Sequence, residues 1–248
     1  MKREPRHFRC LTMHAERLEV DQVWSHTDNL LRRLEHRGGR ATLFVHPFSA
    51  IEAGADLGPK LRSLVERGHE IGQHTHYYAP RPAGSTAKPV SLVDTENVVR
   101  CLDRDLAYLR EAGTDPRGFV AGGWVITTAA IDWLQAQGFT YDASVRSFSL
   151  AYVNARTIAG DRWKQASDED GVVRLPTTTP VARSFKRGSR PISIGVGRYD
   201  MAYIHDYDLL RPRYRMAAAS LFVRWGQGPW KVAAEIARLV AAETLPTP

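Results

Sequence analysis

The chain has 248 residues, of which 43% are hydrophobic and 25% are charged, and its formal net charge is +7. These values are those of an ordinary soluble globular protein, so they exclude a disordered or low-complexity chain. With two cysteines, Cys10 and Cys101, we expect buried free thiols and no disulfide framework.

The apolar runs of the chain bear on its location. Residues 1–14 are basic but lack the apolar run of a secretory signal peptide. No stretch approaches the ~18 consecutive apolar residues that a membrane helix needs. We therefore expect a cytoplasmic protein with no membrane partner.

Basic residues gather in two segments of the last third of the chain. The clusters are Arg183, Lys186, Arg187 and Arg190, and then Arg211, Arg213 and Arg215. The simpler interpretation is a solvated basic surface, and the alternative is attraction for an anionic small molecule such as a phosphorylated or nucleotide-linked sugar. A nucleic-acid partner is not expected, because the sequence has no zinc-finger spacing and no aromatic-basic RNA motif.

The first half of the chain alternates strand-like and helical patterns. Residues 8–13 predict a strand, and Ser25 or Thr27 is the expected cap of the helix that follows. The apolar face of that helix is Val23, Leu30, Leu31 and Leu34. The next expected elements are a strand at Ala41–Val45, a helix over residues 57–65 that ends by Gly68, and a strand at residues 70–72.

The second half continues the alternation. We expect a long helix through residues 98–109, a strand from Phe119, and a helix capped by Thr127 or Thr128. Later strands are expected at residues 172–175 and 202–204, before a helical tail over residues 217–244 that is broken near residues 226–229. This alternation predicts parallel β/α units in one domain spanning residues 1–248, and by itself it fits a barrel or an open doubly wound sheet.

Polar residues follow the predicted strands, where parallel β/α proteins place their sites. These residues are His14 and Glu16, His46, His74 and His76, Asp142, and His205 and Asp206. Two residues apart in extended backbone, His14 and Glu16 face the same side, as do His74 and His76. Imidazole and carboxylate donors suit zinc and similar transition metals. Each pair is also consistent with an exposed polar strand end, and His46 with a structural histidine.

The order of several segments resembles that of the polysaccharide deacetylases. In that family a Gly-His-Glu-Ile-Gly run leads into a metal-binding His-Ser/Thr-x-x-His, which residues 68–75 resemble. The other matching segments are Ala41–Val45, residues 118–124, 138–144, 175–176 and 203–206. The resemblance spans about residues 9–210, and it implies a distorted (β/α) barrel.

The chain departs from the family pattern at three places. The usual Thr-Phe-Asp-Asp-Gly motif is replaced by residues 12–16, so that His14 stands where the base Asp is expected and Ala15 where a metal-binding Asp is expected. Tyr78 stands at the second ligand histidine, and Val120 at the arginine that orients the base. Glu16 and His76 are the candidate substitutes, while the final histidine is retained as His205.

The resemblance implies a metal-dependent hydrolase that removes an N-acetyl or similar acyl group from an amino sugar or related small molecule. We expect a divalent transition metal, best Zn and otherwise Ni, Co or Fe, on His14, His74 and His76. Glu16 is then the general base, or a further ligand that leaves the base unidentified. His205 would protonate the leaving amine, with Asp206 or Asp142 orienting it, and Trp124 and Asp142 would contact the substrate.

Two other functions remain open from the sequence. The missing arginine and the substituted ligand are also consistent with a non-catalytic ligand-binding protein on a deacetylase barrel. A metal-independent hydrolase of other carbon–nitrogen amide bonds is the second alternative.

Overall fold

The computed structural model describes residues 6–82, 85–144, 167–169, 171–181, 191–194, 197–225 and 229–244. The described strands form one sheet in the order β6-β7-β5-β4-β3-β2-β1-β10-β8, with β9 beside β10. Their bounds are β1 Arg6–Ala15, β2 Ala41–Val45, β3 Glu70–Thr75, β4 Gly118–Ala121, β5 Tyr141–Asp142, β6 Ser167–Glu169, β7 Val172–Arg174, β8 Thr179–Pro180, β9 Ile192–Ile194 and β10 Gly197–His205. The pairs are parallel except β6 with β7 and β9 with β10.

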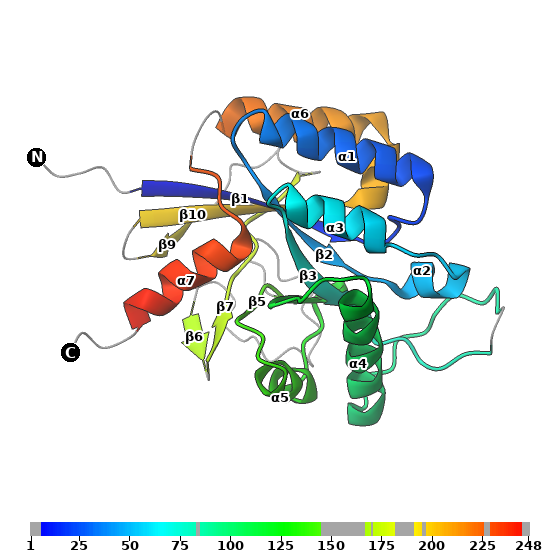
Figure 1. Cartoon of the computed structure of the whole chain (residues 1–248). Coiled ribbons are helices and arrows are strands. Elements are labelled where there is room, and N and C mark those ends of the chain that lie inside the picture. The colour runs from blue at the N-terminus through cyan, green and yellow to red at the C-terminus, as the bar shows by residue number, and fades with distance from the viewer. Residues whose placement is uncertain are drawn as a thin grey trace, which may run out of the picture.

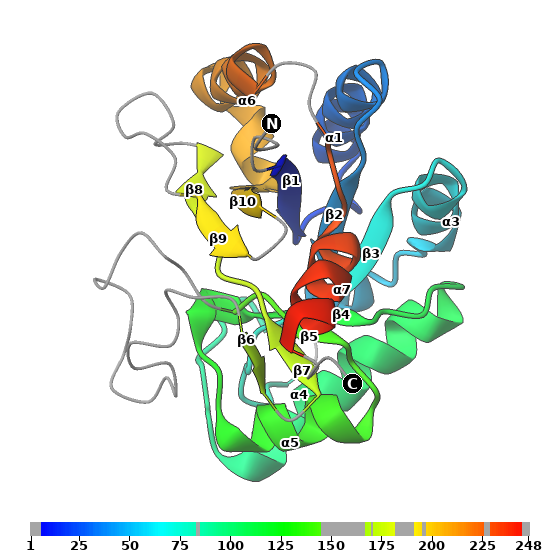
Figure 2. The ribbon, with the colours of Figure 1, turned by 90° about the vertical axis from the view of Figure 1, so that its left-hand side faces the viewer.

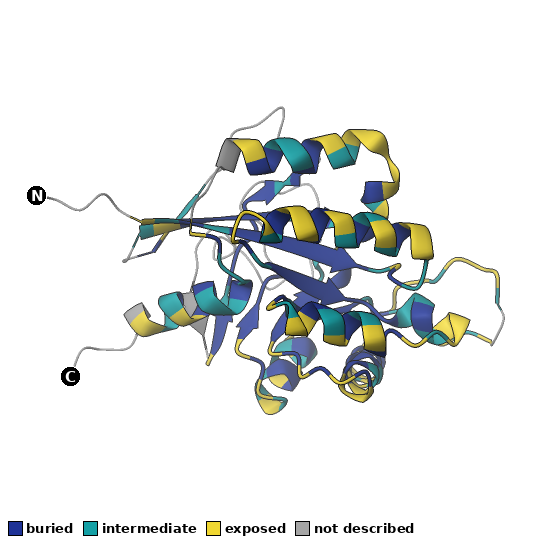
Figure 3. Ribbon diagram, turned by 45° about the horizontal axis from the view of Figure 1, so that its top comes forward, coloured by how far each residue is buried: buried dark blue, intermediate teal, exposed yellow. Residues whose placement is uncertain are grey.

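Helices surround this curled sheet, most of them on its outer face (Figures 1 and 2). They are α1 Asp21–Glu35, α2 Phe48–Ala53, α3 Gly58–Glu66, α4 Thr95–Glu111, α5 Thr128–Ala136, α6 Pro212–Trp225 and α7 Ala233–Thr244, with 3-10 turns η1 Gly122–Trp124 and η4 Asp206–Leu210. The strands are buried, whereas the outer helices alternate buried and exposed faces (Figure 3). The arrangement is the expected distorted (β/α) barrel, with edge strands β6 and β8 unpaired with each other in the described residues.

The alternation of side chains along β1 separates two cores. Leu11 and Met13 face outward and pack with the helices, in a cluster that includes Leu31 and Leu61. Phe8 and Cys10, on the opposite face of β1, point into the barrel. They belong to a second cluster with Phe44, Val120, Tyr141 and part of α7. His14 continues this inward row, so the periodicity of β1 directs it into the barrel at the carboxyl end.

Helix α7 covers the amino end of the barrel. The segment before it pairs with Arg9, and the backbone N–H of Ala233 donates to Thr42 Oγ1 at 2.8 Å. Ala233, Ile236, Ala237 and Val240 are buried against the inward side chains of the strands. The interior is therefore filled from the amino end, and the polar site lies at the opposite end.

Two helix starts test the predicted caps. Helix α5 begins as expected, because the Thr127 hydroxyl accepts a hydrogen bond from Ala130 N. The prediction for α1 is wrong: it begins at Asp21 after Val20, and Thr27 is fully buried inside the helix. Thr27 belongs to the buried stripe that includes Val23 and Leu31. The helix therefore starts one turn before Ser25, and both predicted caps lie inside it.

Other expectations have simple outcomes. Both cysteines are free and buried. No helix in the described ranges is long and apolar enough to cross a membrane. The basic cluster from Arg183 to Arg190 lies outside the described residues, whereas Arg211, Arg213 and Arg215 lie at or near the start of α6.

Candidate metal centre

Four neighbouring strands, in the order β3-β2-β1-β10, bring the predicted residues to the carboxyl end of the barrel. Strand β1 lies between β2 and β10, and His14 is in register with His205 across the β1–β10 pair. Strand β3 lies beside β2 and ends just after His74. Because these strands are parallel, residues from opposite ends of the chain converge at the same edge of the sheet.

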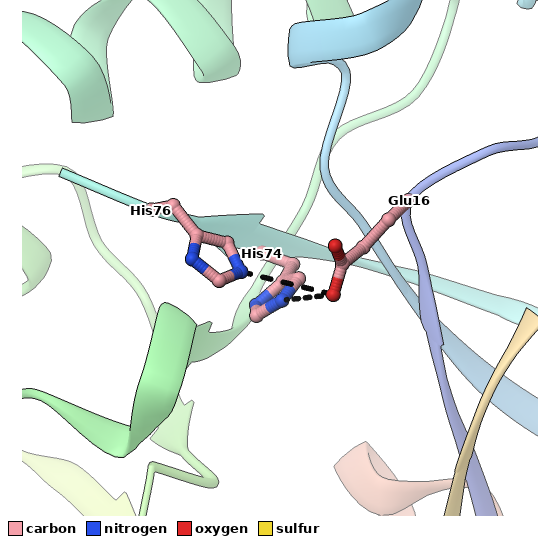
Figure 4. A group of neighbouring side chains, drawn as sticks. All are labelled: Glu16, His74 and His76. Carbon is pink, nitrogen blue, oxygen red and sulfur yellow. Dashed lines mark ion pairs between the residues drawn. The ribbon is translucent and has the colours of Figure 1, made fainter. Parts of the chain in front are cut away.

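Glu16, His74 and His76 point toward one another at this edge (Figure 4). The Oε1 atom of Glu16 is 3.4 Å from His74 Nε2 and 3.7 Å from His76 Nε2. One donor atom from each residue lies within 4.8 Å of the other two. A tetrahedral ion with bonds of about 2.0–2.1 Å separates its ligand atoms by about 3.3 Å, close to the two distances from Glu16 to the histidines.

The hydrogen bonding of His74 directs one nitrogen to this centre. Its Nδ1 is 2.9 Å from the carbonyl of Val120, so the Nδ1–H donates there and Nε2 carries the lone pair. The Nε2 atoms of His74 and His76 are buried without a hydrogen-bond partner in the described structure. Buried polar atoms are normally paired, so two orphaned imidazole nitrogens beside a carboxylate fit a metal ion.

The protonation states of these groups favour metal binding. Burial lowers the pKa of His74 to about 4, despite the neighbouring Glu16. Burial alone would raise the pKa of Glu16, but the His74 and His76 rings beside its carboxylate outweigh this effect, and the pKa is lowered. At neutral pH, His74 is therefore a neutral donor and Glu16 is an anion.

His14 lies beside the three-residue group and outside it. Its ring centroid is 4.7 Å from that of His74 and 5.1 Å from that of His205, and its side chain is buried. Burial, followed by the nearby His74 and His205, lowers the pKa of His14 well below its ordinary value. The structure thus places Glu16 in the position among the donors for which the sequence suggested His14.

His205 faces Glu16 from β10. Its Nε2 is 3.8 Å from Glu16 Oε1, and its Nδ1 is 3.4 Å from Asp208 Oδ2. Asp206, one of the two predicted orienting residues, instead accepts hydrogen bonds from the backbone N–H groups of Arg17 and Tyr207. Asp208 is therefore the orienting carboxylate, and Asp206 fastens the turn after β10 to the turn after β1.

The other predicted orienting and substrate residue, Asp142, is engaged elsewhere. Its side chain is fully buried, with Oδ2 3.2 Å from Arg174 and Oδ1 accepting from Ser144 N at 2.8 Å. The structure does not bring this carboxylate into the group of described contacts around Glu16.

Trp124 and Tyr203 form an aromatic wall next to His14. The ring of Trp124 is 5.3 Å from His14 and 5.2 Å from Tyr203, and the φ of Trp124, 63°, lies in the left-handed region. A tryptophan rarely adopts this conformation, and such strain gathers at functional sites. Just before it, a Cβ at Gly122 would lie 2.3 Å from the His76 ring, so glycine permits the close approach of this turn to His76.

The residues that replace family positions have defined places. Tyr78 stacks on the His76 ring at 5.2 Å, and burial raises the pKa of its hydroxyl to about 12. A hydroxyl that stays protonated is a poor metal ligand, which agrees with His76 taking that place. Val120 is buried inside the barrel and supplies the carbonyl that orients His74.

His46 is a part of this site that sequence reasoning left undecided. Its Nδ1 is 3.1 Å from the His74 carbonyl and 3.3 Å from Asp105 Oδ2, and its ring is 5.0 Å from that of His76. His46 thus supports both histidines of the centre. Its position directly after β2 is the only sequence pattern that pointed to it, while Asp105 in the middle of α4 had none.

Among known proteins, this chain resembles solved structures in its fold. No protein-family model and no curated protein matches the chain. Among solved structures, it resembles a protein assigned as a polysaccharide deacetylase from Mycobacterium smegmatis, with 18% identity, a TM-score of 0.61, and coverage of 100% of this chain and 96% of that one. These values establish a shared fold.

Two further structures share the fold over most of the chain. One is the peptidoglycan deacetylase PdaC from Bacillus subtilis, with 15% identity, a TM-score of 0.51 and coverage of 95% and 92% of the two chains. The other is a mutant, with restored enzymatic activity, of a CE4 family pseudoenzyme from Bacillus anthracis, with 11% identity, a TM-score of 0.50 and coverage of 96% and 69%. The chain therefore has the distorted (β/α) barrel fold of the polysaccharide deacetylases.

Proposed function

We propose that this protein is a metal-dependent amide hydrolase that removes an acetyl or similar acyl group from an amino sugar or a related small molecule. The observation that carries this proposal is the convergence of Glu16, His74 and His76, with donor atoms within 4.8 Å and two orphaned buried nitrogens. This mixed N₂O donor set suits Zn best, and Ni, Co or Fe are also compatible.

Three protein donors leave room for water or substrate at the ion. When bound, the ion lowers the pKa of a water molecule and polarises the amide carbonyl. Glu16 serves as a ligand in this arrangement, because its Oε1 faces both histidine nitrogens. The structure thereby supports one of the two roles that the sequence left open for Glu16.

Two further histidines handle protons. His14 is neutral at physiological pH because burial lowers its pKa, so it is ready to accept the proton of the attacking water. His205 lies on the other side of Glu16, where Asp208 orients it through Nδ1. From there its Nε2 protonates the leaving amine.

An aromatic wall would bind the sugar. Trp124 and Tyr203 stand edge to face at 5.2 Å beside His14, and an indole can stack on the apolar face of a pyranose ring. The turn that carries Trp124 also packs against His76 through Gly122, so substrate contact and metal ligand are set by the same turn.

A non-catalytic ligand-binding role is the second candidate. The same barrel serves a CE4 family pseudoenzyme, and this chain has replaced residues at several motif positions. On this alternative the histidine cluster would bind a ligand without hydrolysing it.

The test combines metal content with turnover. Purified wild type is expected to hold near-stoichiometric metal by elemental analysis and to release acetate from a panel of N-acetylated amino sugars. His74→Ala should lose both properties, with an unchanged circular dichroism spectrum. Metal-loaded wild type without turnover on any substrate of the panel would favour the binding role, and absence of metal after incubation with Zn would contradict the proposed centre.

A further inference from the structure

A second pocket lies on the outside of the barrel, between helices α1 and α6. These helices follow the neighbouring strands β1 and β10 and run side by side (Figures 1 and 2). The pocket between them has a volume of about 470 Å³, within the range of small-molecule sites. None of its lining residues belongs to the histidine centre.

The two walls of the pocket follow helical periodicity. Helix α1 contributes His26, Asn29, Leu30 and Arg33, at spacings of three, four and seven residues from His26. The facing residues from α6 are Pro212, Arg215, Met216 and Ala219, which repeat the same spacing. Each wall therefore places an arginine among smaller or apolar residues on one helix face.

The charge of this pocket is unbalanced. None of the described residues that line it is acidic. Arg215 Nη1 donates to the carbonyls of Leu209 and Leu210 and lies 3.4 Å from His26 Nε2, so none of these contacts is to a carboxylate. In the described part of the chain, the Arg33 side chain has no hydrogen-bond or ion-pair partner. The pocket thus holds two guanidinium groups without a carboxylate.

The remaining surface of the pocket is apolar. Leu30 and Leu209 are buried at its base, and Met216, 67% exposed, forms part of its rim. An exposed methionine beside two arginines that contact no carboxylate in the described structure matches a ligand with an anionic head and an apolar body. Inorganic phosphate alone would use the arginines and leave the apolar surface uncovered.

We propose that the α1–α6 pocket binds a small organic phosphate, with the phosphate held by Arg33 and Arg215 and the apolar part packed on Leu30 and Met216. Guanidinium groups bind phosphate oxygens through paired charge-assisted hydrogen bonds. This site is independent of the proposed hydrolase activity, since it shares no lining residue with Glu16, His74 or His76.

Calorimetric titration of the full-length protein with phenyl phosphate tests this site. Arg33→Gln is expected to weaken binding at least tenfold, as is Arg215→Gln. Arg213→Gln is the matched control, because Arg213 is an exposed residue of the same helix that does not line the pocket. It removes the same charge and should change the affinity less than twofold. Arg33→Gln does not touch the carbonyls that Arg215 contacts, so its effect is separate from any change in the turn at Leu209.

The apolar half of the site has its own test. Ala219→Leu fills space in the pocket and should weaken phenyl phosphate binding at least fivefold, while inorganic phosphate, bound weakly through the arginines, is affected less. Equal losses in Arg33→Gln and Arg213→Gln would show binding to the general positive charge and overturn the proposal. Unaltered binding in Arg33→Gln and Arg215→Gln, or no binding by wild type, would overturn it as well.

Discussion

Strand β3 carries a polar side chain at each end of the barrel, and the two side chains differ in their hydrogen bonding. At the amino end, Glu70 of β3 is half-buried, and its carboxylate accepts hydrogen bonds from the Thr42 and Tyr141 hydroxyls and from Ala234 N. At the carboxyl end of β3, the Nε2 of His74 is fully buried and has no hydrogen-bond partner among the described residues. A satisfied buried group stabilises the fold, whereas an orphaned one marks a place for a ligand.

The sharpest way to break this contrast is to remove Glu70. Glu70→Ala leaves two hydroxyls and one backbone N–H without their acceptor, so we expect a loss of about 4 kcal/mol in the free energy of unfolding. Zn affinity, measured by chelator competition, should remain within about threefold of wild type.

The matched control is Glu70→Gln, which keeps an oxygen acceptor. It also removes the charge whose burial raises the pKa of this carboxyl. It should lie within about 1 kcal/mol of wild type in denaturant unfolding. A large drop in Zn affinity for Glu70→Ala would mean that the two ends are coupled and that the contrast is wrong.

Asp206 sharpens the comparison, because it is a satisfied carboxylate at the site end. Burial raises its pKa to about 6, from an ordinary value of 3.8, although several backbone N–H groups bond to it. The folded state therefore holds a proton that the unfolded state releases, and the stability contributed is lost as the pH rises from about 4 to about 6. The shift of about two units corresponds to about 3 kcal/mol.

Asp206→Asn should remove this pH dependence. Denaturant unfolding at several pH values is expected to give a flatter curve between pH 4 and 6 in the variant, whatever its absolute stability. Identical slopes in the two proteins would show that Asp206 does not titrate in this range.

The smallest expected effect concerns Asp208, whose described contact with the site is through His205. Asp208→Asn should lower kcat about tenfold, with KM and metal content unchanged, because the His205 ring loses its orienting carboxylate. Asp208→Glu, which keeps the charge, is the conservative control and should recover part of the rate. An unchanged kcat in the asparagine variant would remove Asp208 from the mechanism.

Much of this architecture could be predicted from local patterns. The strand–helix alternation predicted parallel β/α units, and the resemblance of residues 68–75 and other segments to the polysaccharide deacetylases implied the barrel. The polar residues that follow the strands predicted that His14, Glu16, His74 and His76 would gather at one edge. The carboxyl ends of parallel strands lie at the same edge of a sheet. Residues that directly follow the strands in the sequence could therefore be predicted to lie close together.

Other features depend on distances that the sequence does not encode locally. Glu16, which follows β1 directly, joins His74 and His76 in the group that could hold a metal ion, and His14 lies outside this group. Asp105 supports His46 from a helix 59 positions later, and Asp208 rather than Asp206 orients His205. These contacts arise from how α4 and η4 pack, and no spacing rule identifies them. The function of Asp142 remains a prediction, although its described contacts are with Arg174 and Ser144.

The pairing of β1 with β10 has a consequence for biosynthesis. Strand β1 is made first, yet nine of its residues find their partners on β10, which lies about 190 positions later. Until then a ribosome-bound chain can pair β1 with β2 but leaves its other edge open, with Leu11 and Met13 beside it. An unpaired apolar edge invites association with other chains, so nascent chains arrested before β10 should depend on chaperones.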